Sequence, residues 1–202
     1  GTFTDGGAGT DTATYTFSSS DSGQATFSII DTKAETLNIS VSGEEKTDDD
    51  SEGNLVVSPG AINKFVLSHD GSGIAGTAES VSVTAYDLYD NVKTNYTGTI
   101  TLDTNGTAGS ISWSLASGSG TFTDGGAGTD TATYTFVSLD SGQASFNITD
   151  TTAETIDIDV SGSGKFDDDT EGNLVIFPSG LDHFKISHDG EATAGSGENI
   201  TI

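Results

Sequence analysis

The first 83 residues of the chain return, without a gap, 119 positions later. Residues 1–83 align with residues 120–202, and 52 of the 83 aligned positions are identical. The opening stretch GTFTDGGAGTDTATYTF recurs letter for letter at residues 120–136. Self-similarity at a fixed period indicates a tandem array in which each repeat is one structural unit, and a period of 119 residues suits one ordinary domain. The chain is therefore expected to fold as copies of one unit in series.

Within the repeat, apolar residues alternate with threonine, serine or aspartate, as in ATYTF and TIDIDV. A period of two predicts β-strands with one buried side and one side in water, and we find no segment with a sustained helical period. The side chains expected inside are Tyr134, Phe136, Phe146, Ile156 and Ile158. The side chains expected to face water are Thr133, Thr135, Asp157 and Asp159.

Seven or eight short strands are expected per repeat, separated by Gly-rich and Asp/Asn-rich stretches. The expected strands are 62–68 (A), 80–87 (B), 98–103 (C), 110–116, 131–136 (D), 143–148 (E), 155–161 (F) and 173–177 (G). This pattern predicts an all-β fold of tandem Ig-like β-sandwich domains with a 119-residue repeat. Prolines 59 and 178 suit strand ends, because proline cannot donate to a ladder.

The domain boundaries follow from these strands. We expect residues 1–58 to be the C-terminal half of one Ig-like repeat and residues 59–177 to be a complete repeat. Residues 178–202 are then the N-terminal strands A and B of the next repeat. On this assignment the chain begins just before strand D of one sandwich, and the array continues in the same polypeptide beyond both ends.

Residues 75–102, AGTAESVSVTAYDLYDNVKTNYTGTITL, resemble the bacterial immunoglobulin-like domains that repeat in large surface adhesins and invasin-type proteins. Those domains have a Gly before strand B, an Asp at its end, a Gly-Asn turn, and a Tyr-x-Gly that leads into strand C. The matching residues are Gly76, Asp87, Asn91, Tyr96 and Gly98. Asp90 occupies the position where the family usually has glycine. The resemblance covers the whole unit in outline, and it implies an architecture and a place at the cell surface rather than a ligand.

The charge of the chain limits the classes of molecule that it is expected to bind. Acidic residues number 31 against six basic ones, so the formal net charge is −25. This balance argues against nucleic acid, whose phosphates require cations, and against anionic membrane surfaces. No apolar run approaches the roughly 20 residues of a membrane helix, so no membrane insertion is expected in this segment. The acidity favours cation binding or solubility in a salty medium, and the sequence leaves both explanations open.

No enzymatic activity is expected. Cysteine is absent, and the three histidines are the only side chains able to act as neutral-pH bases. No serine lies in a nucleophile-elbow motif. The stretch DGGAGTD lacks the lysine and the following helix of a phosphate-binding loop, so it predicts a tight turn.

Charge is densest in KTDDDSEGN, residues 46–54, and in its copy KFDDDTEGN, residues 165–173. Calcium prefers several oxygen ligands, chiefly carboxylates and carbonyls. We therefore expect a Ca²⁺ site in each copy, built from Asp48, Asp49, Asp50 and Glu52 in the first and from Asp167, Asp168, Asp169 and Glu171 in the second. Because these stretches connect strands F and G, we expect them at the end of the sandwich that faces the preceding domain, beside the B–C loop. A solvated acidic loop is one alternative, and a covalent staple from Lys46 or Lys165 to an asparagine is another.

These features predict a structural repeat of a long extracellular or cell-surface protein, acting as a stalk, spacer or fibre in an adhesin-like array. Its expected partners are the neighbouring repeats of the same chain, with self-association into fibres as a further possibility. Two alternatives remain open: a subunit of a laterally packed extracellular filament or sheath, and a glycan- or protein-binding Ig-like module.

Overall fold

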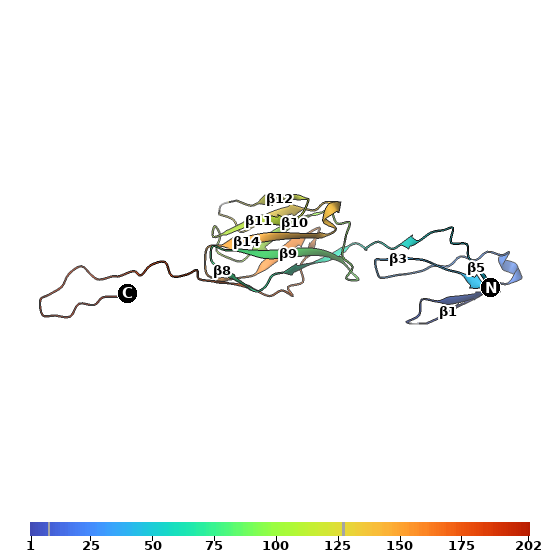
Figure 1. Cartoon of the computed structure of the whole chain (residues 1–202), viewed down its shortest axis with the longest axis horizontal. Helices are drawn as coiled ribbons and strands as arrows, with labels where there is room; N and C mark the ends of the chain where they lie inside the picture. The colour runs from blue at the N-terminus through green and yellow to red at the C-terminus, as the bar shows by residue number, and fades with distance from the viewer. Residues whose placement is uncertain (8, 127) are drawn as a thin grey trace.

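The computed structural model describes residues 1–7, 9–126 and 128–202, and it shows an elongated all-β chain (Figure 1). A β-sandwich lies in the middle, with the N-terminal segment extending from one end and the C-terminal segment from the other. In the described residues, helical structure is limited to two 3₁₀ turns, Ser19–Asp21 and Ser138–Asp140. The expected all-β class is therefore confirmed.

Two sheets form the sandwich. The first is antiparallel in the order β11 (Ile111–Ser117), β14 (Gln143–Asp150), β9 (Ala78–Asp87), β7 (Ile62–Ser68). The second has the order β12 (Thr121–Asp124), β13 (Ala132–Thr135), β10 (Thr99–Thr104), β16 (Ile158–Gly162), β17 (Lys165–Phe166). A short ladder of β15 (Thr155–Ile156), β18 (Leu174–Phe177) and β8 (Ser72–Ile74) completes the unit, with β18 and β8 parallel.

This strand order is Ig-like. With β7, β9 and β14 as strands A, B and E, and β11 as D, the first sheet has the A-B-E-D order of that fold. Strands C (β10) and F (β16) pair in the second sheet. The assignment of residues 131–136 to strand D is wrong. Residues 111–117 pair with strand E and occupy the D position, whereas β13 pairs with β10 on the opposite sheet.

The strand phase expected from the sequence is confirmed. Tyr134, Phe136, Phe146, Ile156 and Ile158 are each at most 1% exposed. Thr133, Thr135 and Asp159 are exposed, and Asp157 is half-buried. Because side chains alternate across a strand, a one-residue slip would have reversed all of these positions together.

Aromatic rings fill the middle of the sandwich. Tyr134 packs edge-on against Phe136 and Phe146, with ring centroids 4.9 and 5.4 Å apart, and Tyr96 packs edge-on against Phe65 and Phe136. Such pairs add about 0.5–1.5 kcal/mol each beyond the burial of their area. The single tryptophan, Trp113, is 4% exposed, and its Nε1–H donates to the Asp130 carbonyl at 2.9 Å. The core is therefore closed in this one unit.

The N-terminal segment repeats the local pairings of the sandwich without its closed core. Its strands are β1 (Thr2–Asp5), β2 (Ala13–Thr16), β3 (Thr36–Leu37), β4 (Ser42–Gly43), β5 (Lys46–Thr47) and β6 (Leu55–Val56). Each lies 119 positions before a strand, or part of a strand, of the sandwich and pairs as that strand does. Phe27, at the repeat position of the fully buried Phe146, is 54% exposed. Local ladders therefore form here, but the apolar face has nothing packed over it.

Residues 178–202 are exposed throughout, with one bridge between Ser187 and Thr201. In the part of the chain that the structure describes, no helix has the length and hydrophobicity needed to span a membrane.

Candidate cation-binding site

The acidic stretch of the complete repeat begins where strand F turns back on itself. β16 and β17 are joined by a two-residue turn, Ser163–Gly164, in which both residues have positive φ. This geometry matches the type I′ hairpin, whose twist suits the flanking strands. The turn brings Asp167 back beside strand F, where its N–H donates to the Val160 carbonyl at 3.0 Å and its Oδ1 accepts from the Val160 N–H at 2.9 Å.

The expected position of this stretch at the domain junction is wrong. Asp167 forms a parallel bridge with Phe65 of β7, and the Gly172 carbonyl lies 3.1 Å from Nε2 of His69, beyond the end of β7. The stretch thus runs along the side of strand A, because the Ser163–Gly164 turn already forms the tip of the F–G connection. Only Asp168 approaches the junction-side loop, through Lys64, whose Nζ lies 3.1 Å from both Asp168 and Asp90.

Three carboxylates converge beside strand F. Asp159, Asp167 and Asp169 each offer an oxygen, and these oxygens all lie within 4.8 Å of one another. Asp159 projects outward from β16, and Asp169 adopts a left-handed backbone with φ of 51°, which Asp tolerates better than most residues. This triad could hold a metal ion.

Several carboxylate oxygens at this place are buried without a hydrogen-bond partner among the described residues: Oδ2 of Asp167 and both oxygens of Glu171. Burial, followed by the charges of Asp167, Asp169 and Asp168, raises the pKa of Glu171 above its ordinary value. Burial also raises the pKa of Asp159, with further contributions from Asp157, Asp167, Asp169 and Asp103. Both shifts come first from burial and then from repulsion between neighbouring carboxylates, and a bound cation would offset that repulsion.

The first copy of the stretch presents a related triad of Asp48, Asp50 and Glu52. Asp48 exchanges the same pair of hydrogen bonds with Val41 that Asp167 exchanges with Val160, each at 2.9 Å. Its Oδ2 is likewise buried without a partner in the described chain. Ser40 stands at the repeat position of Asp159, so the third carboxylate of this triad comes from Glu52 instead.

Five of the eight residues expected to bind calcium therefore lie in triads, and three do not. Asp49 accepts hydrogen bonds from Ser51. Asp168 pairs with Lys64, and although burial raises the pKa of Asp168, its hydrogen bonds to Thr170 and Lys64 lower it overall. Glu171 lies beside the second triad but outside it. Asp159 was missed, although its outward position on strand F and the F–G hairpin together would have placed it near Asp167.

The staple alternative finds no matching geometry. Among the described residues, the side chains of Lys46 and Lys165 form no hydrogen bond with an asparagine. The lysine that ties strands together is Lys64, whose pKa is raised by hydrogen bonds to Asp168 and Asp90. Exposed pairs of this kind contribute little to stability, in the range of about 0–1 kcal/mol.

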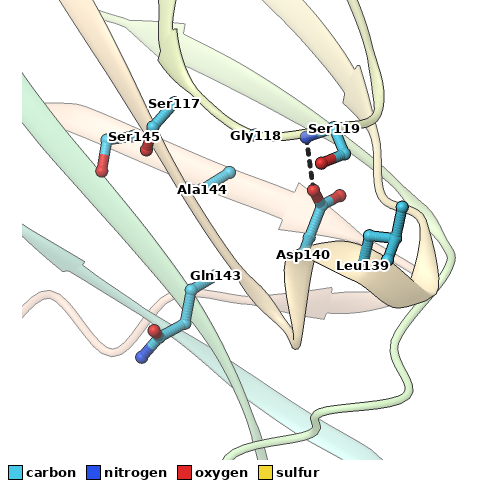
Figure 2. A pocket seen from close by; sticks show the side chains of 8 residues that line it. All are labelled: Ser117, Gly118, Ser119, Leu139, Asp140, Gln143, Ala144 and Ser145. Carbon is cyan, nitrogen blue, oxygen red and sulfur yellow. Dashed lines mark hydrogen bonds between the residues drawn. The ribbon is translucent and has the colours of Figure 1, made fainter.

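A shallow groove of about 340 Å³ lies where the end of β11, the Ser138–Asp140 turn and the start of β14 meet (Figure 2). It is lined by Ser117, Gly118, Ser119, Leu139, Asp140, Gln143, Ala144 and Ser145. Its one carboxylate, that of Asp140, turns toward the backbone and accepts hydrogen bonds from Ser119 N–H at 2.6 Å and Val137 N–H at 2.8 Å. The Tyr134 hydroxyl donates to its other oxygen at 3.0 Å. Asp140 thus fastens the loops around the groove and is not free to act on a ligand.

No protein-family model and no curated protein sequence matches the chain. Among solved structures it is similar to domains 4 and 5 of the S-layer protein SbsC, with 16% identity and a TM-score of 0.38, covering 65% of this chain and 59% of that one. It is also similar to the Escherichia coli adhesin FdeC, with 16% identity and a TM-score of 0.42, covering 67% of this chain and 38% of that one. A third similar structure is the Yersinia pseudotuberculosis adhesin InvE, with 17% identity and a TM-score of 0.35, covering 65% of this chain and 37% of that one. The chain spans about 37–59% of the length of these three.

Proposed function

We propose that the chain is a structural repeat region of a long extracellular surface protein, in which Ig-like sandwiches in series form a stalk or spacer. The observation that supports this most is geometric. The 119-residue repeat closes into one sandwich, and the flanking segments leave from opposite ends of it (Figure 1). Repeats joined in this way add length with every copy instead of folding back on one another.

The spacing role follows from the physics of such arrays. Each repeat contacts mainly its neighbours, so stability and reach are sums over units. The ten-residue strand β9 spans about 33 Å at roughly 3.3 Å per residue, which sets the scale of the extension per domain. The rigid element is the sandwich, and the joint between sandwiches decides how stiff the array is.

One observation favours lateral packing as a second role. The outward positions of β9, β11 and β14 carry only serine, threonine, asparagine, glutamine, tyrosine and alanine. The outward side of the other sheet carries Asp103, Asp157 and Asp159. In a chain of net charge −25, like-charged copies would meet with least repulsion across the uncharged outward positions of these three strands. Electron micrographs of the native assembly separate the roles, since single extended threads favour the spacer and side-by-side bundles favour the sheath.

Antibodies raised against this chain test the proposal on intact source cells. The surface protein should be accessible to them without permeabilisation, and on denaturing gels it should migrate far above the 20.5 kDa of this chain. A species of only about this mass, or one reached only after lysis, would defeat the long surface array.

We also propose that calcium binds the triad of Asp159, Asp167 and Asp169. The support lies in the three converging oxygens, in the unpartnered oxygens of Asp167 and Glu171, and in the recurrence of a triad in the first copy. Calcium accepts six to eight oxygens and keeps waters among them, so an open site of three carboxylates suits a weak extracellular site. Affinity on the order of 0.1–1 mM is expected for such modules.

Calcium should therefore raise the melting temperature of the sandwich, because a ligand that binds only the folded form stabilises it. Thermal unfolding followed by Trp113 fluorescence measures this for calcium, magnesium and sodium at matched ionic strength. The double substitution Asp159→Asn and Asp169→Asn should abolish the calcium-specific rise, because it removes two of the three carboxylates of the triad. Neither carboxylate has a hydrogen bond in the described structure, so the fold should not depend on them. The matched control is the double substitution Asp11→Asn and Asp124→Asn. It removes the same amount of charge elsewhere, and the calcium-specific rise should persist in it. Equal stabilisation by all three cations would leave only screening of the net charge.

A further inference from the structure

Two consecutive repeats meet at the linker of residues 58–60, and the side chain of Asn91 spans this joint. Asn91 lies in the B–C loop of the sandwich. Its Nδ2–H donates to the carbonyl of Thr32 at 2.8 Å, and its Oδ1 accepts from the N–H of Ala34 at 2.9 Å. A single amide thus pairs with the backbone on both sides of Lys33, in the preceding repeat.

We infer that Asn91 is an inter-repeat latch that recognises the E–F loop of the preceding repeat and fixes the angle between consecutive sandwiches. This inference rests on the proposed array and names the contact that makes it stiff. The amide of asparagine carries both a donor and an acceptor. It can therefore satisfy one backbone carbonyl and one N–H at once, which neither a carboxylate nor an alkyl side chain can do.

Asn91 is held in position by a buried carboxylate. Asp87 is 1% exposed and accepts hydrogen bonds from the backbone N–H groups of Gly60, Tyr89 and Asn91 at 2.7–2.9 Å. It also accepts from Nδ2 of Asn91, with the two oxygens 3.2 and 3.0 Å away. Burial raises the pKa of Asp87, but these hydrogen bonds outweigh burial and bring it down to about 2. The carboxylate therefore stays charged at neutral pH and orients the amide toward the preceding repeat.

The linker is fastened at the same place. Gly60 donates to Asp87, and Lys93 Nζ donates to the carbonyl of Pro59 at 3.2 Å. Proline additionally fixes its own φ. The turn that carries Asn91 needs a left-handed residue at position 90, where Asp90 has φ of 60°. A groove of about 520 Å³ lies alongside, with Val57, Pro59 and Val92 among its lining residues.

At its other end, the complete repeat has backbone groups equivalent to the Thr32 carbonyl and the Ala34 N–H that Asn91 binds. Lys33 N–H donates to Asp31 at 2.8 Å, and at the equivalent positions Thr152 N–H donates to Asp150 at 2.8 Å, so the two E–F loops share one turn. The carbonyl of Thr151 and the N–H of Ala153 are the equivalents of the latched groups, and neither is hydrogen-bonded within the described residues. The repeat thus carries the Asn91 amide at one end and, at the other, the backbone groups that such an amide binds. A second copy of the same unit can therefore dock in series.

The test uses the whole 202-residue chain, whose lack of cysteine allows clean spin-labelling at Thr14→Cys and Ser112→Cys. Asn91→Ala should broaden the distance distribution between the labels and should speed amide exchange at Ala34 about tenfold, in line with the loss of one net hydrogen bond. The matched control is Asn95→Ala, which removes an exposed asparagine of the same loop without a hydrogen bond in the described structure and should change neither.

Asn91 also supports its own loop, so Trp113 fluorescence must first show that the sandwich of each variant is folded. If Asn91→Ala unfolds the sandwich, Ala34→Pro decides, because it deletes the N–H on the other side of the latch and leaves Asp87 and Asn91 intact. The latch would be overturned if Asn91→Ala, or Ala34→Pro where Asn91→Ala unfolds the sandwich, leaves the distance distribution as narrow as Asn95→Ala does. That result would leave the surface array untouched, since the size and accessibility of the native protein test it separately.

Discussion

Replacing Phe146 with alanine is expected to lower the free energy of unfolding of the sandwich by about 3–5 kcal/mol, as for other buried phenylalanines. The side chain is fully buried and lies between the rings of Tyr134 and Phe122, with centroids 5.4 and 6.0 Å away. Its removal loses both apolar burial and packing contacts, because a closed β-sandwich relaxes only partly around a cavity. A small domain has total stability of about 5–15 kcal/mol, so much of the margin would disappear.

The repeat supplies a matched control for this substitution. Phe27 occupies the same repeat position, but it is 54% exposed, and its ring lies beside the rings of Phe3 and Tyr15. Phe27→Ala should change the unfolding of the sandwich by no more than about 0.5 kcal/mol, as surface substitutions do. Urea unfolding followed by Trp113 fluorescence measures both variants. Equal losses for the two would mean that Phe27 stabilises the sandwich as much as Phe146 does, contrary to the exposure of Phe27 in the structure.

Strand positions were predictable because they depend on local alternation. Residues 62–68 were expected as a strand and form β7 without change. Residues 155–161 were expected as one strand but form two, since β15 pairs with β18 whereas β16 pairs with β10. The alternation predicts which side chains of a strand face inward, but it does not predict which neighbouring strand it pairs with. For the same reason residues 111–117 were not recognised as strand D.

The candidate cation site was predictable in composition but not in position. The density of carboxylates in residues 167–171 is evident from the sequence. Their placement along β7 depends on the Ser163–Gly164 turn and on the bridge from Asp167 to Phe65, which are long-range features. The contact of Asn91 with Thr32 and Ala34 joins residues 57–59 positions apart, and it escaped notice because an Asn in a turn is ordinarily explained by the turn itself.

We propose that residues 59–177 are the folding unit of the array. Two fragments of one repeat length test it, residues 59–177 and residues 1–119. Both contain Trp113 and one copy of nearly every part of the repeat. In the second fragment, however, residue 58 is bonded directly to residue 59. Figure 1 places the corresponding points, the end of β18 and the start of β7, at opposite ends of the sandwich, so the second fragment cannot close on itself.

Equilibrium unfolding and sedimentation of the two fragments provide the most direct test. Residues 59–177 should be monomeric, bury Trp113 and unfold in one cooperative transition, as small single domains do. Residues 1–119 should show an exposed Trp113 as a monomer, or should bury it only in oligomers in which chains exchange halves. A cooperative, monomeric fragment 1–119 as stable as fragment 59–177, or a fragment 59–177 that fails to fold, would contradict the unit proposed for the array.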